Sequence, residues 1–301
     1  MVVRKGRLLE GIKRMAVRER AFRFEGAGGA DIAGFRWTDD TVTPHAVLIV
    51  AHGMGEHARR YLAPLASLIA TGWAIYAQDH RGHGLTAGTA EALGDFGENG
   101  AQLIVEDLHR LTSLAHAEHQ DLPRILLGHS MGSFLAQAFV FDHSRAIDGL
   151  VLSGTAAFGD RTDGPRRLDE VKVEGVTPRT PFDWLSRDPA EVDAYIADPL
   201  CGFSPKPGGD NGFGRLAARI RDPVEIAKIR KDLPIYIFVG DKDPINQGLA
   251  LLKPLVDRYR DAGLTRVEVK VYPEGRHEML NETNRAEVVA DLTVWLERVA
   301  G

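Results

Sequence analysis

The sequence predicts an α/β fold in which a mostly parallel sheet carries helices on both faces. Short runs such as Ala46–Ala51 are apolar throughout, which is typical of strands that are covered on both faces. These runs alternate along the chain with stretches of helical periodicity, and that alternation is typical of a parallel sheet wound on both sides. The chain has 301 residues, which is enough for one large domain with an insertion.

Each predicted element follows from its own pattern. Residues 16–24 and 30–38 alternate in polarity on either side of a glycine-rich turn, so they predict an antiparallel hairpin. On the predicted helix 99–119, four leucines are expected on the inner side: Leu103, Leu108, Leu111 and Leu114. The remaining strands are expected at Ala46–Ala51, 73–77, 125–127, 147–152, 235–239 and Val267–Tyr272, and the remaining helices at 60–71, 134–140, 246–261 and 284–299.

The composition is that of an ordinary soluble protein, with 44% hydrophobic and 26% charged residues. The formal net charge of −5 argues against nucleic acid as a main partner. Cys201 is the only cysteine, so an intrachain disulfide is excluded. No apolar run approaches the ~20 residues that a membrane span needs. We therefore expect a cytoplasmic protein whose contact with membranes is peripheral at most; its oligomeric state is left open.

The first 20 residues differ from the rest in charge. They carry seven basic and two acidic residues, hence a local net charge of +5. A signal peptide is not predicted, because no long apolar stretch follows these charges. Leu8, Ile12 and Met15 share one helical face, which would suit a basic amphipathic helix on anionic lipid. We favour a basic extension over residues 1–15, with Met15 as an alternative start, because strand-like sequence begins just after it.

Residues 155–230 interrupt the alternation of strands and helices. This stretch holds 8 of the 15 prolines, a density that is incompatible with a sheet or a long helix. We expect an inserted cap of short helices and loops above the carboxyl ends of the strands, dividing the core into residues 16–154 and 231–301. Its large apolar side chains either form a small core of the cap, which we favour, or line a pocket: Phe158, Phe182, Trp184, Tyr195, Leu200, Phe203 and Phe213.

The segment Gly128-His129-Ser130-Met131-Gly132 lies where a predicted buried strand turns into a predicted helix. This is the context of the G-x-S-x-G turn, in which a sharp bend holds a serine Oγ exposed above the sheet. Gly128 and Gly132 lack side chains where the bend brings backbone segments close together. The N-terminus of the following helix adds positive potential where negative charge develops. Ser130 is therefore predicted as a nucleophile.

A serine nucleophile needs a histidine as base and a carboxylate that orients the histidine. After a serine in such a turn, the acid and then the histidine follow along the chain, and only His143 and His277 follow Ser130. His143 ends the next helix, at least about 18 Å away at ~1.5 Å rise per residue. His277 comes just past the last strand and is therefore favoured. Asp243 is favoured over Asp241 as the acid, because it lies further into the loop after the preceding strand.

An oxyanion that forms on an attacked carbonyl group needs two backbone N–H donors. One is expected from Met131, directly after the nucleophile, and the other from Met54, in the loop that follows strand Ala46–Ala51. Gly53 and Gly55 on either side of Met54 let this loop fold closely.

Two other groups of polar residues compete for a role in the site. The first group is His52, Glu56 and His57. Its spacing, H-x-x-x-E-H, matches neither H-E-x-x-H nor H-x-x-E-H, so no metal site is predicted there. The second group is Asp79, Arg81 and His83, in the loop after the predicted strand 73–77. These side chains are expected to brace that loop by hydrogen bonds and an ion pair.

With these residues in place, the chain resembles the α/β-hydrolase superfamily. Within it, the chain is similar to the monoacylglycerol lipase and lysophospholipase group, which is also grouped with serine aminopeptidase-like hydrolases. The resemblance covers residue 18 to the end, and four segments carry it: HGMGEH at 52–57, DHRGHG at 79–84, GHSMG at 128–132 and GRHE at 275–278.

The resemblance implies the α/β-hydrolase fold, a triad of Ser130, Asp243 and His277, and oxyanion donors at Met54 and Met131. It also implies a small-molecule carboxylic ester with a single acyl chain as substrate, and neither a metal nor an organic cofactor. The implied reaction is acyl transfer to water through an acyl-serine intermediate.

Several alternatives stay open beside this reaction. An amidase or aminopeptidase uses the same triad, a non-catalytic homologue would only bind a ligand, and an alcohol other than water could accept the acyl group. A dehalogenase is excluded, because it needs an aspartate in place of Ser130. The length of the acyl chain is not implied, although the charges of the cap slightly favour shorter esters: Arg166, Arg167, Asp169, Glu170 and Lys172.

Overall fold

The computed structural model describes residues 17–159, 167–206 and 210–301. Its centre is an 8-stranded sheet in the order β1-β2-β4-β3-β5-β6-β7-β8. β1 pairs antiparallel with β2, as the predicted hairpin requires, and β2 pairs antiparallel with β4; the remaining pairs of described strands are parallel. The strands are β1 Val17–Glu25, β2 Asp31–Asp39, β3 Ala46–Ala51, β4 Trp73–Gln78, β5 Arg124–His129, β6 Gly149–Ser153, β7 Ile235–Gly240 and β8 Val267–Tyr272.

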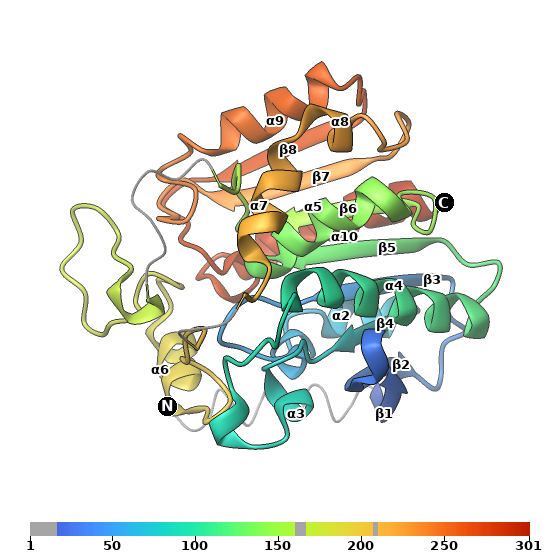
Figure 1. Ribbon diagram of the computed structural model, residues 1–301, viewed down its shortest axis with the longest axis horizontal. Helices are drawn as coiled ribbons and strands as arrows, with labels where there is room; N and C mark the ends of the chain where they lie inside the picture. The colour runs from blue at the N-terminus through green and yellow to red at the C-terminus, as the bar shows by residue number, and fades with distance from the viewer. Residues whose placement is uncertain (1–16, 160–166, 207–209) are drawn as a thin grey trace.

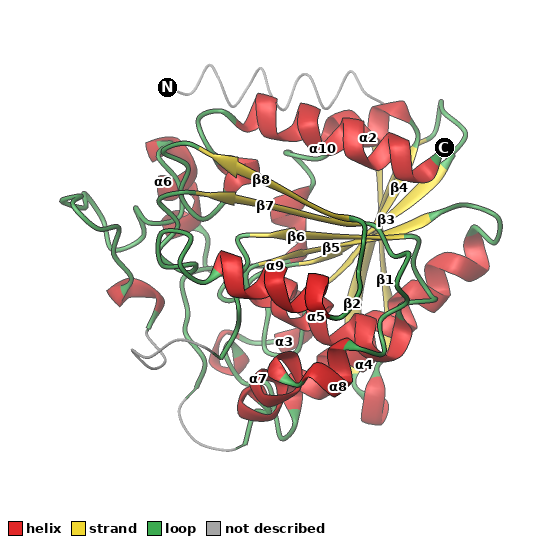
Figure 2. Cartoon of the chain, turned by 90° about the horizontal axis from the view of Figure 1, so that it is seen from above, coloured by secondary structure: helices red, strands yellow, loops and turns green. Residues whose placement is uncertain are grey.

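Helices cover both faces of this sheet (Figures 1 and 2). α2 and α10 pack on one face, whereas α4, α5, α7 and α9 pack on the other. The α-helices are α2 Ala66–Thr71, α3 Gly84–Ala87, α4 Gly100–Glu118, α5 Met131–His143, α6 Pro189–Ala197, α7 Phe213–Arg221, α8 Pro223–Ile226, α9 Leu252–Asp261 and α10 Arg285–Ala300. The 3₁₀ helices are η1 Ala27–Gly29, η2 Ala58–Tyr61, η3 Ala90–Ala92, η4 Leu168–Glu170 and η5 Met279–Asn281.

The two helical layers explain why the central strands are apolar at every position. Successive side chains of a strand point to opposite faces. In β3, Val47 and Ile49 therefore join the core beneath α4 and α5, while Leu48 and Val50 join the core beneath α2 and α10. All four side chains are at most 1% exposed. The α/β fold predicted from these runs is confirmed.

Two predicted helices begin later than their patterns indicated. In place of one helix over 60–71, η2 ends at Tyr61 and α2 begins at Ala66. Pro64 lies between them and disfavours a helical conformation of the residue before it. In place of a helix over 246–261, α9 begins at Leu252. Gln247 and Leu249 have φ values of 54° and 75°, which a right-handed helix does not allow.

The inner side of α4 also differs in part from the prediction. The two middle leucines are buried as expected, but Leu114 is 40% exposed and Leu103 is only partly buried. Ile104 and Ala115 are fully buried in their place. The buried stripe therefore follows the spacing of 104, 108, 111 and 115, which keeps to one face of a helix.

The segment between β6 and β7 divides into two parts in the described residues. One part forms a small core of its own, with Trp184 and Tyr195 in it, as favoured from the sequence. The other part contains α7, whose Leu216 and Ile220 belong to the main core beneath α4 and α5. Phe213 likewise packs against that main core. The basic extension predicted over residues 1–15 lies outside the described residues.

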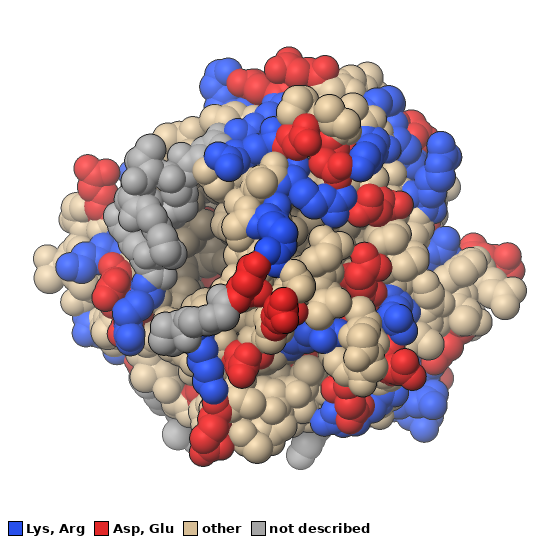
Figure 3. Space-filling model, in the orientation of Figure 1, with Lys and Arg blue, Asp and Glu red and all other residues tan. Residues whose placement is uncertain are grey.

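No helix in the three described ranges is long and apolar enough to cross a membrane. On the face shown in Figure 3, positive and negative side chains are interspersed, without one extended basic surface. The carboxyl ends of the parallel strands β3, β5, β6, β7 and β8 lie at one edge of the sheet. The loops at this edge hold the residues that the sequence predicted for the site.

Candidate active site

The turn between β5 and α5 holds Ser130 in a strained backbone conformation, with φ of 52° and ψ of −120°. Residues other than glycine rarely adopt a positive φ, and such strain concentrates at functional sites. A Cβ atom on Gly128 would lie 2.4 Å from the carbonyl oxygen of Gly132, and a Cβ atom on Gly132 would lie 2.0 Å from that of Ala51. The glycines around Ser130 therefore allow three backbone segments to touch.

The loop after β3 lies against this turn. A Cβ atom on Gly53 would lie 3.1 Å from the Cβ atom of Ser130, so Met54 directly follows a residue that contacts the serine. Among the hydrogen bonds of the described residues, none uses the backbone N–H of Met54 or of Met131. In the described part of the chain, no hydrogen-bond partner therefore competes for these two donors, as an oxyanion site requires.

His277 and Asp243 form a buried hydrogen-bonded pair at the same edge of the sheet. His277 Nδ1 lies 2.9 Å from Asp243 Oδ2, and the two side chains are 1% and 0% exposed. Asp243 Oδ1 accepts the backbone N–H of Ile245 at 2.8 Å, which fixes the carboxylate. When Nδ1 donates to Asp243, Nε2 of the neutral ring is an acceptor, and it has no hydrogen-bond partner in the described part of the chain.

The surroundings of His277 set its protonation. Burial lowers its pKa, but the charge and the hydrogen bond of Asp243 outweigh burial and raise the pKa above its ordinary value. The rings of His129 and Trp184 lie with their centres 4.8 and 5.0 Å from the ring of His277. Burial is the main cause that lowers the pKa of His129 to about 4, and the nearby positive charge of His277 is the second. His129 is therefore uncharged at neutral pH.

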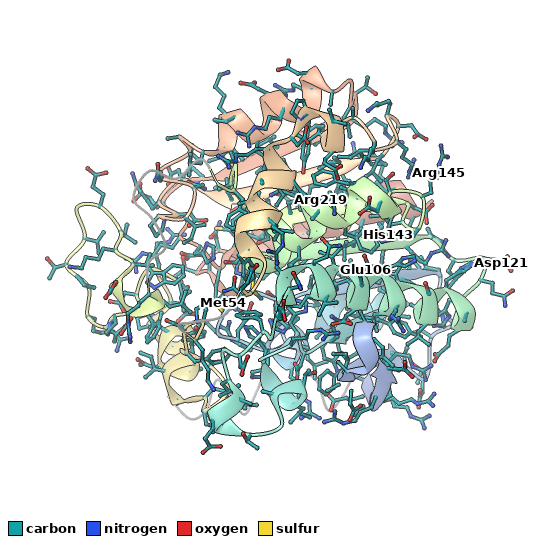
Figure 4. The ribbon with its side chains drawn as sticks, viewed as in Figure 1. Met54, Glu106, Asp121, His143, Arg145 and Arg219 are labelled. Atoms are coloured by element: carbon teal, nitrogen blue, oxygen red, sulfur yellow. The ribbon has the colours of Figure 1, made fainter. Side chains whose placement is uncertain are left out.

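The two alternatives from the sequence, Asp241 and His143, are not members of this hydrogen-bonded pair. No described hydrogen bond joins Asp241 to His277. His143 is at the C-terminal end of α5, and its ring stacks on that of His109 from α4 with centres 3.8 Å apart. Figure 4 shows His143 beside Glu106 and away from Met54.

A buried network of three charged residues adjoins the site, and the sequence patterns did not predict it. Arg60 donates to Glu56 at 2.6 Å and to both carboxylate oxygens of Glu278 at 2.7 and 2.8 Å. Glu56 also accepts the backbone N–H of Gly53 at 2.5 Å. The positions of the two carboxylates along the chain could have indicated this network, because Glu56 lies in the loop of Met54 and Glu278 directly follows His277.

The side chains of His52, Glu56 and His57, which were considered as metal ligands, do not meet at one point in the described structure. His52 Nδ1 lies 2.8 Å from the carbonyl oxygen of Gly53, and its Nε2 accepts the backbone N–H of His80 at 3.0 Å. Both ring nitrogens of His52 are thus engaged within the fold, and burial lowers its pKa to about 3.

The loop after β4 is braced as predicted. Asp79 accepts the backbone N–H groups of Ala58 and Leu85 at 2.9 and 2.7 Å. Arg81 forms an ion pair of 2.7 Å with the buried Asp107. His83 Nε2 accepts the backbone N–H of Gly55 at 3.3 Å. These side chains hold the loops of β3 and β4 together.

Hydrolases of the α/β-hydrolase fold carry their reacting groups in loops at this edge of the sheet, and the chain is an enzyme of that class. The family model of the serine aminopeptidases, S33, matches residues 42–284. The chain belongs to this family, so the predicted family and fold are both confirmed.

Individual relatives resemble the chain over most of its length. A monoacylglycerol lipase from Mycolicibacterium smegmatis is 35% identical over 279 residues, which are 91% of this chain and 95% of that protein. Human monoglyceride lipase is 28% identical over 281 residues, which are 87% of this chain and 86% of that protein.

The solved structures support the same fold. A thermostable carboxyl esterase from Bacillus coagulans in complex with glycerol matches with a TM-score of 0.83 and 27% identity, covering 94% of this chain and 99% of that one. A soluble variant of monoglyceride lipase from Saccharomyces cerevisiae in complex with a substrate analog matches with a TM-score of 0.72 and 20% identity, covering 94% and 95%.

Proposed function

We propose that the chain hydrolyses carboxylic esters of a single acyl chain, monoacylglycerols among them, through an acyl-serine intermediate. The observation that carries the proposal is the buried hydrogen bond between His277 and Asp243 at the sheet edge that also holds Ser130. The 35% identity to a monoacylglycerol lipase over 91% of the chain supports the substrate class. A cytoplasmic location, with peripheral membrane contact at most, is part of the proposal and rests on composition alone.

In the proposed mechanism, His277 Nε2 takes the proton of Ser130 Oγ as this oxygen attacks the ester carbonyl. The N–H groups of Met54 and Met131 donate to the oxyanion that forms. Asp243 holds the His277 tautomer and stabilises its positive charge. The protonated His277 then gives its proton to the leaving alcohol. Water, activated by the same histidine, cleaves the acyl ester of Ser130 and restores the hydroxyl group.

The proposed cap, residues 155–230, is supported by contacts with the loop of His277. The backbone N–H of Glu278 donates to the carbonyl oxygen of Leu185 at 2.7 Å. Arg187 forms an ion pair of 2.9 Å with Glu282, which is fully buried. In this proposal the cap covers the acyl chain of the substrate, because its segment around Trp184 lies beside His277.

The test is hydrolysis of p-nitrophenyl esters from acetyl to palmitoyl, with Ser130→Ala as the comparison. Ester turnover by the native chain with a loss of at least about 10³-fold in Ser130→Ala is expected. Unchanged turnover in the variant would overturn the assignment of Ser130. A maximum at eight carbons or more supports the lipase-like part of the proposal, and monoglycerides are then the next substrates to test. A maximum at two to four carbons contradicts that part.

The amide alternative is tested in the same assay. Matched esters and anilides of one acyl group differ only in the bond that is cleaved, so their ratio of kcat/KM separates an esterase from an amidase. We expect a preference for the ester. A preference for the anilide would favour an aminopeptidase, and absence of turnover together with no reaction with a fluorophosphonate would favour a non-catalytic binding protein.

A further inference from the structure

Three side chains with metal-binding atoms meet where the cap touches the loop after β3. They are His57 of that loop, and Asp198 and Cys201, which follow α6. One nitrogen, oxygen or sulfur atom from each lies within 4.8 Å of the corresponding atoms of the other two. Among the described residues, no other group of three or more histidine, cysteine, aspartate or glutamate side chains brings its metal-binding atoms this close together.

The geometry of the group is close to that of a coordination site. His57 Nε2 lies 3.1 Å from Asp198 Oδ2. Bonds of about 2.0–2.3 Å to a tetrahedral ion would separate the ligand atoms by roughly 3.3–3.7 Å. Ligand atoms that lie within 4.8 Å of one another therefore need only small shifts to share one ion. Asp198 and Cys201 are separated by two residues, a spacing that lets neighbouring ligands share one ion.

The site is reachable, and its backbone is held in place. The His57 and Asp198 side chains are 11% and 32% exposed, and Cys201 is half-buried. The backbone N–H of Cys201 donates to the carbonyl oxygen of Asp198 at 3.0 Å, and that of Gly202 donates to Gly55 at 2.9 Å. The Asp198 carboxylate keeps its second oxygen on the backbone N–H of Leu200 at 2.9 Å. An ion would therefore meet ligands on a backbone that is already held in place.

The charges around Cys201 favour a divalent cation. Asp198, Glu56 and Glu278 are the carboxylates that act electrostatically on this thiol, and Arg60 is the opposing guanidinium. Three negative charges against one positive charge leave a formal surplus of two negative charges. Arg60 is paired directly with Glu56 and Glu278, so its single positive charge is shared among three carboxylates.

We propose that His57, Asp198 and Cys201 bind a thiophilic divalent cation, with Zn²⁺ as its representative. A ligand set of one imidazole, one carboxylate and one thiolate suits Zn²⁺ and not Mg²⁺ or Ca²⁺, which take oxygen ligands. As the sulfur–metal bond forms, the Cys201 thiol releases its proton to water. The ion joins the cap to the loop that carries Met54. The fourth position of the ion is left to a water molecule.

The test is binding of Co²⁺ and Zn²⁺ to the full chain, without any substrate, so its outcome is independent of the proposed esterase function. One equivalent of Co²⁺ should produce thiolate-to-cobalt charge-transfer absorption, and Zn²⁺ should displace it. Because burial raises the pKa of the Cys201 thiol, about one proton per ion should be released at neutral pH. Zn²⁺ should also raise Tm, since it binds only the folded chain.

The variants Cys201→Ser and Asp198→Asn separate this site from adventitious binding. Cys201→Ser should lose the charge-transfer absorption and the proton release. Loss of even an outer partner of a metal weakens binding by about 10- to 100-fold, so each variant should bind Zn²⁺ at least about 100-fold more weakly. His45→Ala removes a half-exposed histidine elsewhere and should leave binding unchanged.

Three results would overturn the proposal. They are Co²⁺ binding without charge-transfer absorption in the native chain, absorption that persists unchanged in Asp198→Asn, and equal loss of binding in His45→Ala. Circular dichroism without metal shows whether each variant is folded. If Cys201→Ser does not fold, Asp198→Asn decides alone, since the Asp198 carboxylate is partly exposed and a neutral amide is tolerable at that position.

Discussion

The guanidinium group of Arg60 donates two hydrogen bonds, 2.7 and 2.8 Å long, to the carboxylate of Glu278. Glu278 directly follows His277 along the chain. The same guanidinium group donates to Glu56, whose carboxylate accepts the N–H of Gly53 beside Ser130. Arg60 thus joins the loop of the histidine to the loop after β3, and the side chains involved are almost entirely buried.

Replacement of Arg60 by methionine should destabilise the fold and lower kcat. The change leaves Glu56 and Glu278 buried together without a counter-charge, and removal of one partner from a buried ion pair costs about 3–5 kcal/mol. Denaturant unfolding measures this cost. The neighbouring Arg59 is 44% exposed in its ion pair with Glu19, so Arg59→Met should cost about 1 kcal/mol or less. Equal costs for the two variants would contradict the role of Arg60.

Asp243→Asn should lower kcat strongly while the chain stays folded. The amide no longer fixes the His277 tautomer or stabilises its positive charge, and the corresponding change in a serine triad costs on the order of 10⁴-fold in kcat. Steady-state kinetics on one p-nitrophenyl ester measure the loss. Asp241→Asn, two residues earlier, is the matched control and should keep most of the activity. A larger loss in Asp241→Asn would reverse the assignment of the acid.

The kcat/KM for an uncharged ester should fall as the pH decreases through the pKa of His277, because only the neutral ring accepts the serine proton. Asp243 raises this pKa above its ordinary value of about 6.5, so the inflection is expected above about pH 6.5. In Asp243→Asn burial dominates, and the inflection should move to lower pH. An inflection that stays unchanged in this variant would exclude His277 as the titrating base.

The contribution of His277 to stability has the opposite pH dependence. A folded-state pKa above the unfolded value means that the folded chain binds the proton more tightly. This contribution to the free energy of unfolding is therefore present below about pH 6.5 and is lost as the pH rises through the raised pKa.

Gly132→Ala should destabilise the fold severely, because the added Cβ atom would lie 2.0 Å from the carbonyl oxygen of Ala51. Overpacking of this kind costs about 1–3 kcal/mol or more. Gly214→Ala is the matched control. Gly214 lies in α7 with no atom within 4 Å of the added methyl group, so alanine should stabilise the helix by up to about 1 kcal/mol. Thermal unfolding of both variants checks the contrast, and similar Tm values would contradict it.

Local sequence patterns were sufficient for the fold and for the loops of the candidate site. The apolar run of β3 indicated a strand covered on both faces, because a strand with a solvated face alternates in polarity. The glycines around Ser130 indicated a sharp turn, because only a residue without a side chain allows the contact of Gly132 with Ala51. His277 and Asp243 could be paired in advance, since both follow parallel strands and the carboxyl ends of such strands share one edge.

Periodicity was a weaker guide where a single residue decides the backbone. The pattern over 60–71 suits a helix, but Pro64 divides it, and the pattern over 246–261 suits a helix until Gln247 and Leu249 adopt positive φ. Amphipathic patterns report which side of a segment is buried, but they do not report where hydrogen bonding of the helix starts.

The sequence by itself determined the α/β fold, the strained serine turn and the loops that bear the candidate site, because each is encoded by neighbouring residues. Only the tertiary structure decided which distant groups meet: Arg60 with Glu278, His57 with Asp198, and Trp184 with His277. The first contact joins η2 to the loop after β8, and the other two join the segment between β6 and β7 to the loops after β3 and β8. Burial and charge make such pairs favourable once they are close, but composition and spacing along the chain do not select among the available partners.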